Sequence, residues 1–289
     1  MRRTSLLLLS CAIATGAAAC ADSSDPGIVN DEDPLISSNG LSSNGLSSNG
    51  LSSNGLSSNA LSSNALSSNA LSSNALVIKA LQDPGATGDL TRMFFRYLIS
   101  CALPTNHSVT YTWKDSTGQL HTEIDPGGLG LAPTWETSAP TQDQKEIVSA
   151  CLMARTNSKG IPVPLSLRAK GVAALAVSAS ERSTYTYGEG AFWGNLFNGT
   201  NPPYAYSCSR VAFNAGISTS QFLTQGRTCT TTACGIITPV GPCYTSDSAS
   251  SGQACYDHDG GKDWVSACNS QDKKYVTSSS NVITTWLEP

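Results

Sequence analysis

Hydrophobic residues recur at every fifth position between residues 36 and 75, where the unit Ile/Leu-Ser-Ser-Asn-Gly/Ala is repeated eight times. On a helix, leucines five positions apart are rotated by about 140° from one another, so they form no continuous apolar stripe. On a strand, the odd spacing puts consecutive leucines on opposite faces. A short square solenoid with one unit per side and a flexible Ser/Asn/Gly-rich spacer both fit this pattern, and we favour the spacer.

Two segments after the repeat tract have the spacing of amphipathic helices. We expect the first to be capped by Asp89 and to end near Ala102, before Pro104, and the second to run from about Thr141 to Arg155. Their apolar faces comprise Leu90, Phe94, Tyr97, Leu98 and Cys101 in the first helix, and Ile147, Val148, Cys151 and Leu152 in the second. Because two such helices in one small domain share a core, we predict a disulfide between Cys101 and Cys151.

Alternation of apolar and polar residues on either side of Asp115-Ser116-Thr117-Gly118 predicts a hairpin. We set Lys114 opposite Gln119. The resulting pairs are Trp113 with Leu120, Tyr111 with Thr122, and Val109 with Ile124. In this register His121 and Glu123 lie on the polar face of the hairpin.

Further strands are expected downstream. Residues 161–167 alternate like a strand at a sheet edge, because Pro162 and Pro164 cannot donate hydrogen bonds there. Residues 172–178 and 184–187 are weaker candidates, and residues 282–287 are expected to form a closing strand. The predicted fold is α+β: a single disulfide-stapled domain, residues 79–289, with two helices and an antiparallel sheet. The repeat tract, residues 36–78, precedes it.

The amino terminus has the pattern of an export signal over residues 1–19. A basic start is followed by an apolar core and by a small-residue cleavage site, Ala17-Ala18-Ala19. The junction Ala19-Cys20 resembles a bacterial lipobox, which would make Cys20 the lipidated first residue and the membrane the partner of the anchor. Cleavage without lipidation, giving a soluble secreted protein, is the alternative. Residues 20–35 carry acidic side chains without basic ones and are expected to be a disordered linker.

Eight cysteines remain after the signal, apart from the candidate lipid site. An even number in an exported chain predicts up to four disulfides, whereas zinc is disfavoured because no histidine is near the clustered cysteines. The eight are Cys101, Cys151, Cys208, Cys229, Cys234, Cys243, Cys255 and Cys268. Their connectivity beyond the first pair is not fixed by the sequence.

Several residues are candidates for chemistry. His121 with Glu123 is a weak catalytic pair that lacks an evident nucleophile. Asp257, Asp259 and Asp263 lie beside a glycine turn and are weak candidates for calcium ligands, although Lys262 would repel the cation. Four aromatic residues are candidates for a platform that binds a glycan or a peptide: Phe192, Trp193, Tyr204 and Tyr206. Three acids, Glu136, Glu181 and Glu189, are the candidates for a pair of hydrolase carboxylates.

Four segments are similar to uncharacterised exported bacterial proteins that also carry LSSNA-type repeats. They are residues 101–104, residues 129–133, residues 148–155 and the stretch GEGAFWGNLF at residues 188–197. This resemblance brings no known activity. The repeat tract also resembles the pentapeptide-repeat family loosely, because Asn and the small residue are swapped around each leucine.

The formal net charge of −4 at pH 7 gives no basic surface for nucleic acid. We therefore expect a lipoprotein at the cell envelope or cell surface that has a non-catalytic binding or structural role, with a glycan or protein as its ligand and without a cofactor. An exported hydrolase that uses Glu or Asp and a histidine on a glycan or peptide is the alternative.

Overall fold

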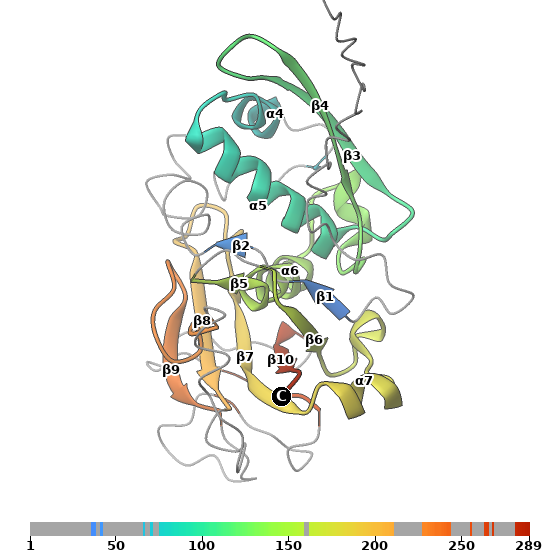
Figure 1. The fold of residues 1–289 in the computed structure, drawn as a ribbon, viewed down its shortest axis with the longest axis vertical. Helices are drawn as coiled ribbons and strands as arrows, with labels where there is room; N and C mark the ends of the chain where they lie inside the picture. Colours follow the sequence, from blue (N-terminus) through green and yellow to red (C-terminus); the bar gives the residue numbers. More distant parts are fainter. Residues whose placement is uncertain are drawn as a thin grey trace, which may run out of the picture.

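The computed structural model describes residues 36–38, 41–42, 66, 70–71, 75–158, 162–210, 227–243, 255, 263–265, 268 and 281–289. These residues form an α+β fold, as the sequence predicts. They contain four α-helices rather than two, together with a six-stranded sheet and two small two-stranded sheets. The helices α4 and α5 and a β-hairpin lie together at one end of the molecule, and most of the six-stranded sheet lies at the other (Figure 1).

The six-stranded sheet has the order β1-β6-β10-β7-β8-β9 and is antiparallel except for the pair β8–β9. Its strands are β1 (Ile36–Ser38), β6 (Pro164–Arg168), β10 (Ile283–Leu287), β7 (Tyr187–Asn195), β8 (Tyr204–Ser209) and β9 (Thr238–Pro242). The expected closing strand is present as β10, in the middle of the sheet. The expected edge position of β6 is wrong, because the first repeat unit supplies β1 on its outer side.

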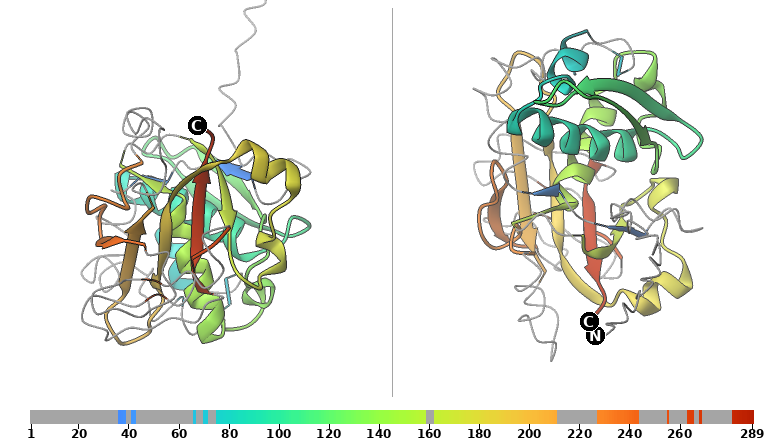
Figure 2. Two further views of the ribbon diagram at one scale, coloured as in Figure 1. Left: turned by 90° about the horizontal axis from the view of Figure 1, so that it is seen from below. Right: turned by 45° about the horizontal axis from the view of Figure 1, so that its top comes forward.

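Helix α6 (Gln142–Ala154) packs against β7 and β10, and α5 (Ala86–Ala102) packs against α6 (Figure 2). Helix α6 begins where the sequence predicts, and Thr141 caps it, since its side chain accepts a hydrogen bond from the backbone N–H of Gln144. By contrast, α5 begins three residues before the expected cap. Its N-cap is Gly85, and Asp89 lies in the first turn, where its carboxylate pairs with Arg92.

The two remaining helices are shorter. Helix α4 (Ala75–Leu81) leads directly out of the repeat tract. Helix α7 (Ala179–Thr184) lies between the two weaker strand candidates, residues 172–178 and 184–187, and neither of them forms the expected strand: the first contains the 3-10 turn η2 (Ala173–Leu175), and of the second only Tyr187 belongs to a strand, β7. Ser178, the last residue of the first candidate, forms a capping box with Glu181 and so starts α7.

The predicted hairpin is present as β3 (Ser108–Lys114) and β4 (Leu120–Pro126), but its register is shifted by one residue. Lys114 lies opposite Leu120 and Trp113 opposite His121. Asp115 causes the shift, because its carboxylate accepts hydrogen bonds from the backbone N–H groups of Thr117 and Gln119 and so closes a longer loop. A one-residue shift moves every side chain of β4 to the other face relative to β3.

Two hydrophobic clusters lie on opposite sides of β7, all of whose residues are buried. Phe192 belongs to the larger cluster, together with α5 and α6, whereas Ala191 and Trp193 belong to the smaller one. Successive side chains of a strand point to opposite faces, which explains the division. Four half-cystines, Cys208, Cys243, Cys255 and Cys268, form much of the smaller cluster, so cross-links take the place of aliphatic side chains there.

All eight cysteines of the domain are paired. The bonds are Cys101–Cys151, Cys208–Cys243, Cys229–Cys234 and Cys255–Cys268. The first joins α5 to α6, which is the pair that the two apolar helix faces predict. Disulfides of this number indicate folding in an oxidising, non-cytoplasmic compartment. In the part of the chain described above, no helix combines the length and the apolar character needed to cross a membrane.

Candidate interaction site

The expected position of His121 and Glu123, the weak catalytic candidates, on the polar face of the hairpin is wrong. The shifted register sets them opposite Trp113 and Tyr111, on the side where Arg92 and Arg96 of α5 contact Trp113 and Glu123. Nε2 of His121 lies 2.9 Å from Oδ2 of Asp115, and its ring stacks on Trp113. This contact with His121 is the main reason that the pKa of Asp115 lies well below its usual value. Glu123 accepts a hydrogen bond from Nε1 of Trp113. Both side chains therefore have partners that hold the hairpin loop and its tryptophan in place.

A buried carboxyl that the sequence did not single out lies on the same side of the hairpin. Asp125 is 1% exposed, and its Oδ1 lies 3.4 Å from Nε of Arg96 on α5. Burial raises the pKa of Asp125 to about 6, and Arg96 offsets part of that effect. Tyr111 is also buried there, and burial followed by the charge of Asp125 raises its pKa. Both groups are therefore enclosed between the hairpin and its neighbours rather than presented to solvent.

The four aromatic candidates do not form one platform. Phe192 and Trp193 are fully buried on opposite sides of β7. Tyr204 and Tyr206 on β8 are half-buried, and the hydroxyl of Tyr204 lies 3.4 Å from a carboxylate oxygen of Glu146. At least two of the four residues therefore serve as core rather than as a binding surface.

Asp263, one of the three calcium candidates, is already paired with two guanidinium groups. Its Oδ1 accepts from Arg168 at 3.2 Å and from Arg182 at 2.9 Å. These two cations compensate the carboxylate charge that a metal would need. Asp257 and Asp259 lie outside the described residues, and the described ones contain no group of three metal-binding side chains.

The three candidate hydrolase acids have separate partners. Glu136 pairs with His107, and Glu181 accepts a hydrogen bond from Ser166. Glu189 forms a two-pronged ion pair with Arg227, and both side chains are almost completely buried. No two of the three carboxylates share a partner in these contacts, so the contacts do not assemble the carboxylate pair of a glycosidase.

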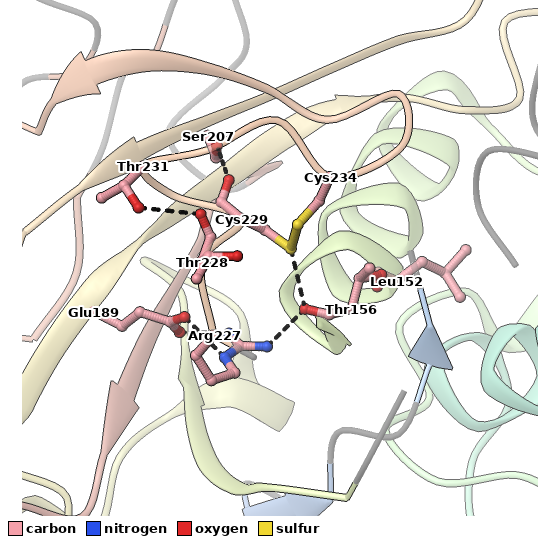
Figure 3. The surroundings of a disulfide bond; sticks show 9 residues. All are labelled: Leu152, Thr156, Glu189, Ser207, Arg227, Thr228, Cys229, Thr231 and Cys234. Carbon is pink, nitrogen blue, oxygen red and sulfur yellow. Dashed lines mark hydrogen bonds and ion pairs between the residues drawn. A yellow bond between two sulfur atoms is a disulfide. The ribbon is translucent and has the colours of Figure 1, made fainter. Parts of the chain in front are cut away.

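Figure 3 shows the contacts that Arg227 and the neighbouring Cys229–Cys234 disulfide make with three elements of the fold. Nη1 of Arg227 donates to the backbone carbonyl of Thr156, 2.8 Å away, while its other nitrogens hold Glu189 on β7. Sγ of Cys229 contacts the same carbonyl, and Ser207 on β8 donates to the carbonyl of Cys229. The cluster joins Thr156, which lies just after the end of α6, to β7 and β8.

The repeat tract meets the domain at its two ends. At the amino-terminal end, Ile36–Ser38 pairs with β6, and β2 (Leu41–Ser42) pairs in parallel with β5 (Thr156–Asn157). At the other end, Leu66 and Leu71 are 0% and 1% exposed in the main hydrophobic cluster. The backbone N–H of Leu71 also donates to the carbonyl of Trp135.

These contacts belong to repeat units one, two, seven and eight. In these four units the tract is part of the packing of the domain rather than a spacer separated from it. The sequence did not predict this packing. A period of five residues by itself favours neither a helix nor a strand, and in these four units the domain supplies the partner strand or the core. Cys20, the candidate lipid site, lies outside the described residues.

Comparison with known proteins identifies the tract alone. The GLTT repeat family matches residues 36–62 with six copies. No curated protein and no solved structure matches the chain. The family match supports a repeat tract, and the domain that follows is matched by nothing in these comparisons.

Proposed function

We propose that the protein is an exported, non-catalytic binding or structural protein that a lipid on Cys20 attaches to the cell envelope. Two features of the sequence support the anchor: the signal pattern of residues 1–19 and the cysteine directly after its cleavage site. The four disulfides fit an exported chain. A glycan or another protein would be the ligand of a binding role.

The observation that favours a non-catalytic role is that buried acidic side chains form ion pairs with arginines. Glu189 is enclosed with Arg227, and Asp263 with Arg168 and Arg182, where they join distant elements of the fold. A general acid or base must reach its substrate within hydrogen-bonding distance. Carboxylates held inside the fold by arginines support packing rather than turnover, so the hydrolase alternative has less support.

The anchor is tested by Cys20→Ala. We expect this change to move the protein from the detergent phase to the aqueous phase in a two-phase partition, because the acylated residue is lost. Cys11→Ala is the matched control, since Cys11 lies inside the signal that cleavage removes, and it should leave the partition unchanged. Equal partition of the Cys20→Ala variant and the unaltered protein would rule out a lipid at this position.

A further inference from the structure

The outer side of β6 is covered by three residues of the repeat tract. Ile36 lies opposite Ser166, Ser37 opposite Leu165 and Ser38 opposite Pro164, in antiparallel register. Without β1, β6 would be the edge strand of the six-stranded sheet. Open edge strands present backbone N–H and C=O groups that readily accept another strand.

The segment that covers this edge is one of eight nearly identical units. Every unit has an aliphatic residue followed by Ser-Ser-Asn. The unit at β1 has Ile36 where the others have leucine, and it ends in glycine like units two to four, whereas units five to eight end in alanine. Strand addition draws its affinity chiefly from main-chain hydrogen bonds. Units two to eight therefore offer β6 almost the same backbone and side chains as β1.

We propose that the outer edge of β6 is an acceptor site for repeat units, filled within one chain by β1 and between molecules by a unit from the tract of a second copy. A second copy fits because it carries the matching sequence eight times, whereas each chain presents this edge once. Exchange of an identical segment between copies is a low-cost route to association.

Charge does not oppose this pairing. No charged residue occurs between Asp33 and Lys79, so two tracts can lie close together without electrostatic repulsion. Twenty residues separate the second unit from the seventh, and an extended chain of that length reaches about 66 Å. A tract can therefore reach a neighbouring molecule while its carboxyl-terminal units stay attached to their own domain.

The experiment uses disulfide trapping in the full chain, with Cys20→Ala in every sample to keep the protein in solution. Ser38→Cys and Pro164→Cys place thiols on directly opposite residues, and Pro164 is exposed. Residues directly opposite across antiparallel strands have Cβ atoms about 4.5–5.5 Å apart, close enough for a disulfide after small adjustments. Both changes in one chain should give an intramolecular cross-link, mapped by peptide analysis.

The decisive sample mixes two singly substituted chains that carry different size tags. Oxidation of Ser38→Cys with Pro164→Cys should give several times more mixed dimer than Ser38→Cys with Lys114→Cys, whose thiol lies on the distant hairpin. Excess peptide ISSNGLSSNG should reduce the mixed dimer. Mixed dimer no higher than the control would overturn acceptance of a second copy, and failure of the doubly substituted chain to close would overturn the acceptor site itself.

Discussion

Asp125 lies in the contact between the hairpin and α5. From α5 it faces Arg96, and from the hairpin it faces Glu123 and Tyr111. Burial raises its pKa to about 6, whereas an aspartate in the unfolded chain has a pKa near 3.9. The folded protein therefore binds a proton that the unfolded chain has released between about pH 4 and pH 6.

The sign of this difference predicts that Asp125 lowers stability as the pH rises from about 4 to about 6. Asp125→Asn, which stays neutral, should remove this loss and be the more stable protein at pH 7, by no more than about 3 kcal/mol. Urea unfolding of both proteins at pH 4, 5, 6 and 7 measures the effect. A stability difference that does not change with pH would contradict it.

Substitutions in the ion pair of Glu189 and Arg227 test whether Glu189 has a structural or a catalytic role. Glu189→Gln should lower the free energy of unfolding by about 3–5 kcal/mol, because it leaves the buried guanidinium without its charge partner. Glu189→Leu combined with Arg227→Met should recover part of that loss, since no unpaired charge remains. Denaturant unfolding measures both. If Glu189→Gln left the protein equally or more stable, the residue would behave like a functional one, and the hydrolase alternative would gain support.

Among the helices and strands, the sequence predicted those whose structure is set by the local pattern of apolar and polar residues. Helix α6 has its predicted start and buried face, and the hairpin is where alternation placed it. The hairpin register depended instead on the carboxylate of Asp115, which the alternation does not reveal. Strand β7 was missed because all its residues are buried, so it lacks the alternation by which a half-buried strand is recognised.

Gly118 gives a prediction for the hairpin loop. Its φ is +87°, and a Cβ atom there would meet nothing within 4 Å, so only backbone conformation opposes a side chain. Gly118→Ala should lower stability by about 1–2 kcal/mol, the cost of the left-handed conformation. Gly118→Asn should cost less, because asparagine tolerates this region. Equal melting temperatures for the alanine and asparagine variants would contradict the loop conformation.

At the scale of the whole molecule, the sequence could not show which repeat units the domain holds. Units three to eight begin with the same four residues as unit two, so their side chains cannot select among them. The last two units are held by the domain because they are next to it in the chain: unit eight ends at Ala75, where α4 begins. The candidate calcium ligand Asp263 was misjudged for a related reason. It pairs with Arg168, which lies 95 residues away, and the sequence does not show which residues meet in the fold.

The packing of the tract is tested by replacing leucines rather than by deleting units, because after a deletion an identical unit can move into the vacated place. Leu71 is 1% exposed in the main hydrophobic cluster, and its backbone N–H is fixed on Trp135. Leu71→Ala should therefore lower the free energy of unfolding by about 2–5 kcal/mol, the usual cost of removing a buried leucine side chain. Leu46→Ala, in unit three, is the matched control, with the same change in a unit that also begins Leu-Ser-Ser-Asn. If both variants unfold at the same denaturant concentration as the unaltered protein, Leu71 contributes nothing to the core, and the packing of the last repeat unit described above is wrong. If Leu71→Ala alone is destabilised, the last repeat unit belongs to the folded domain.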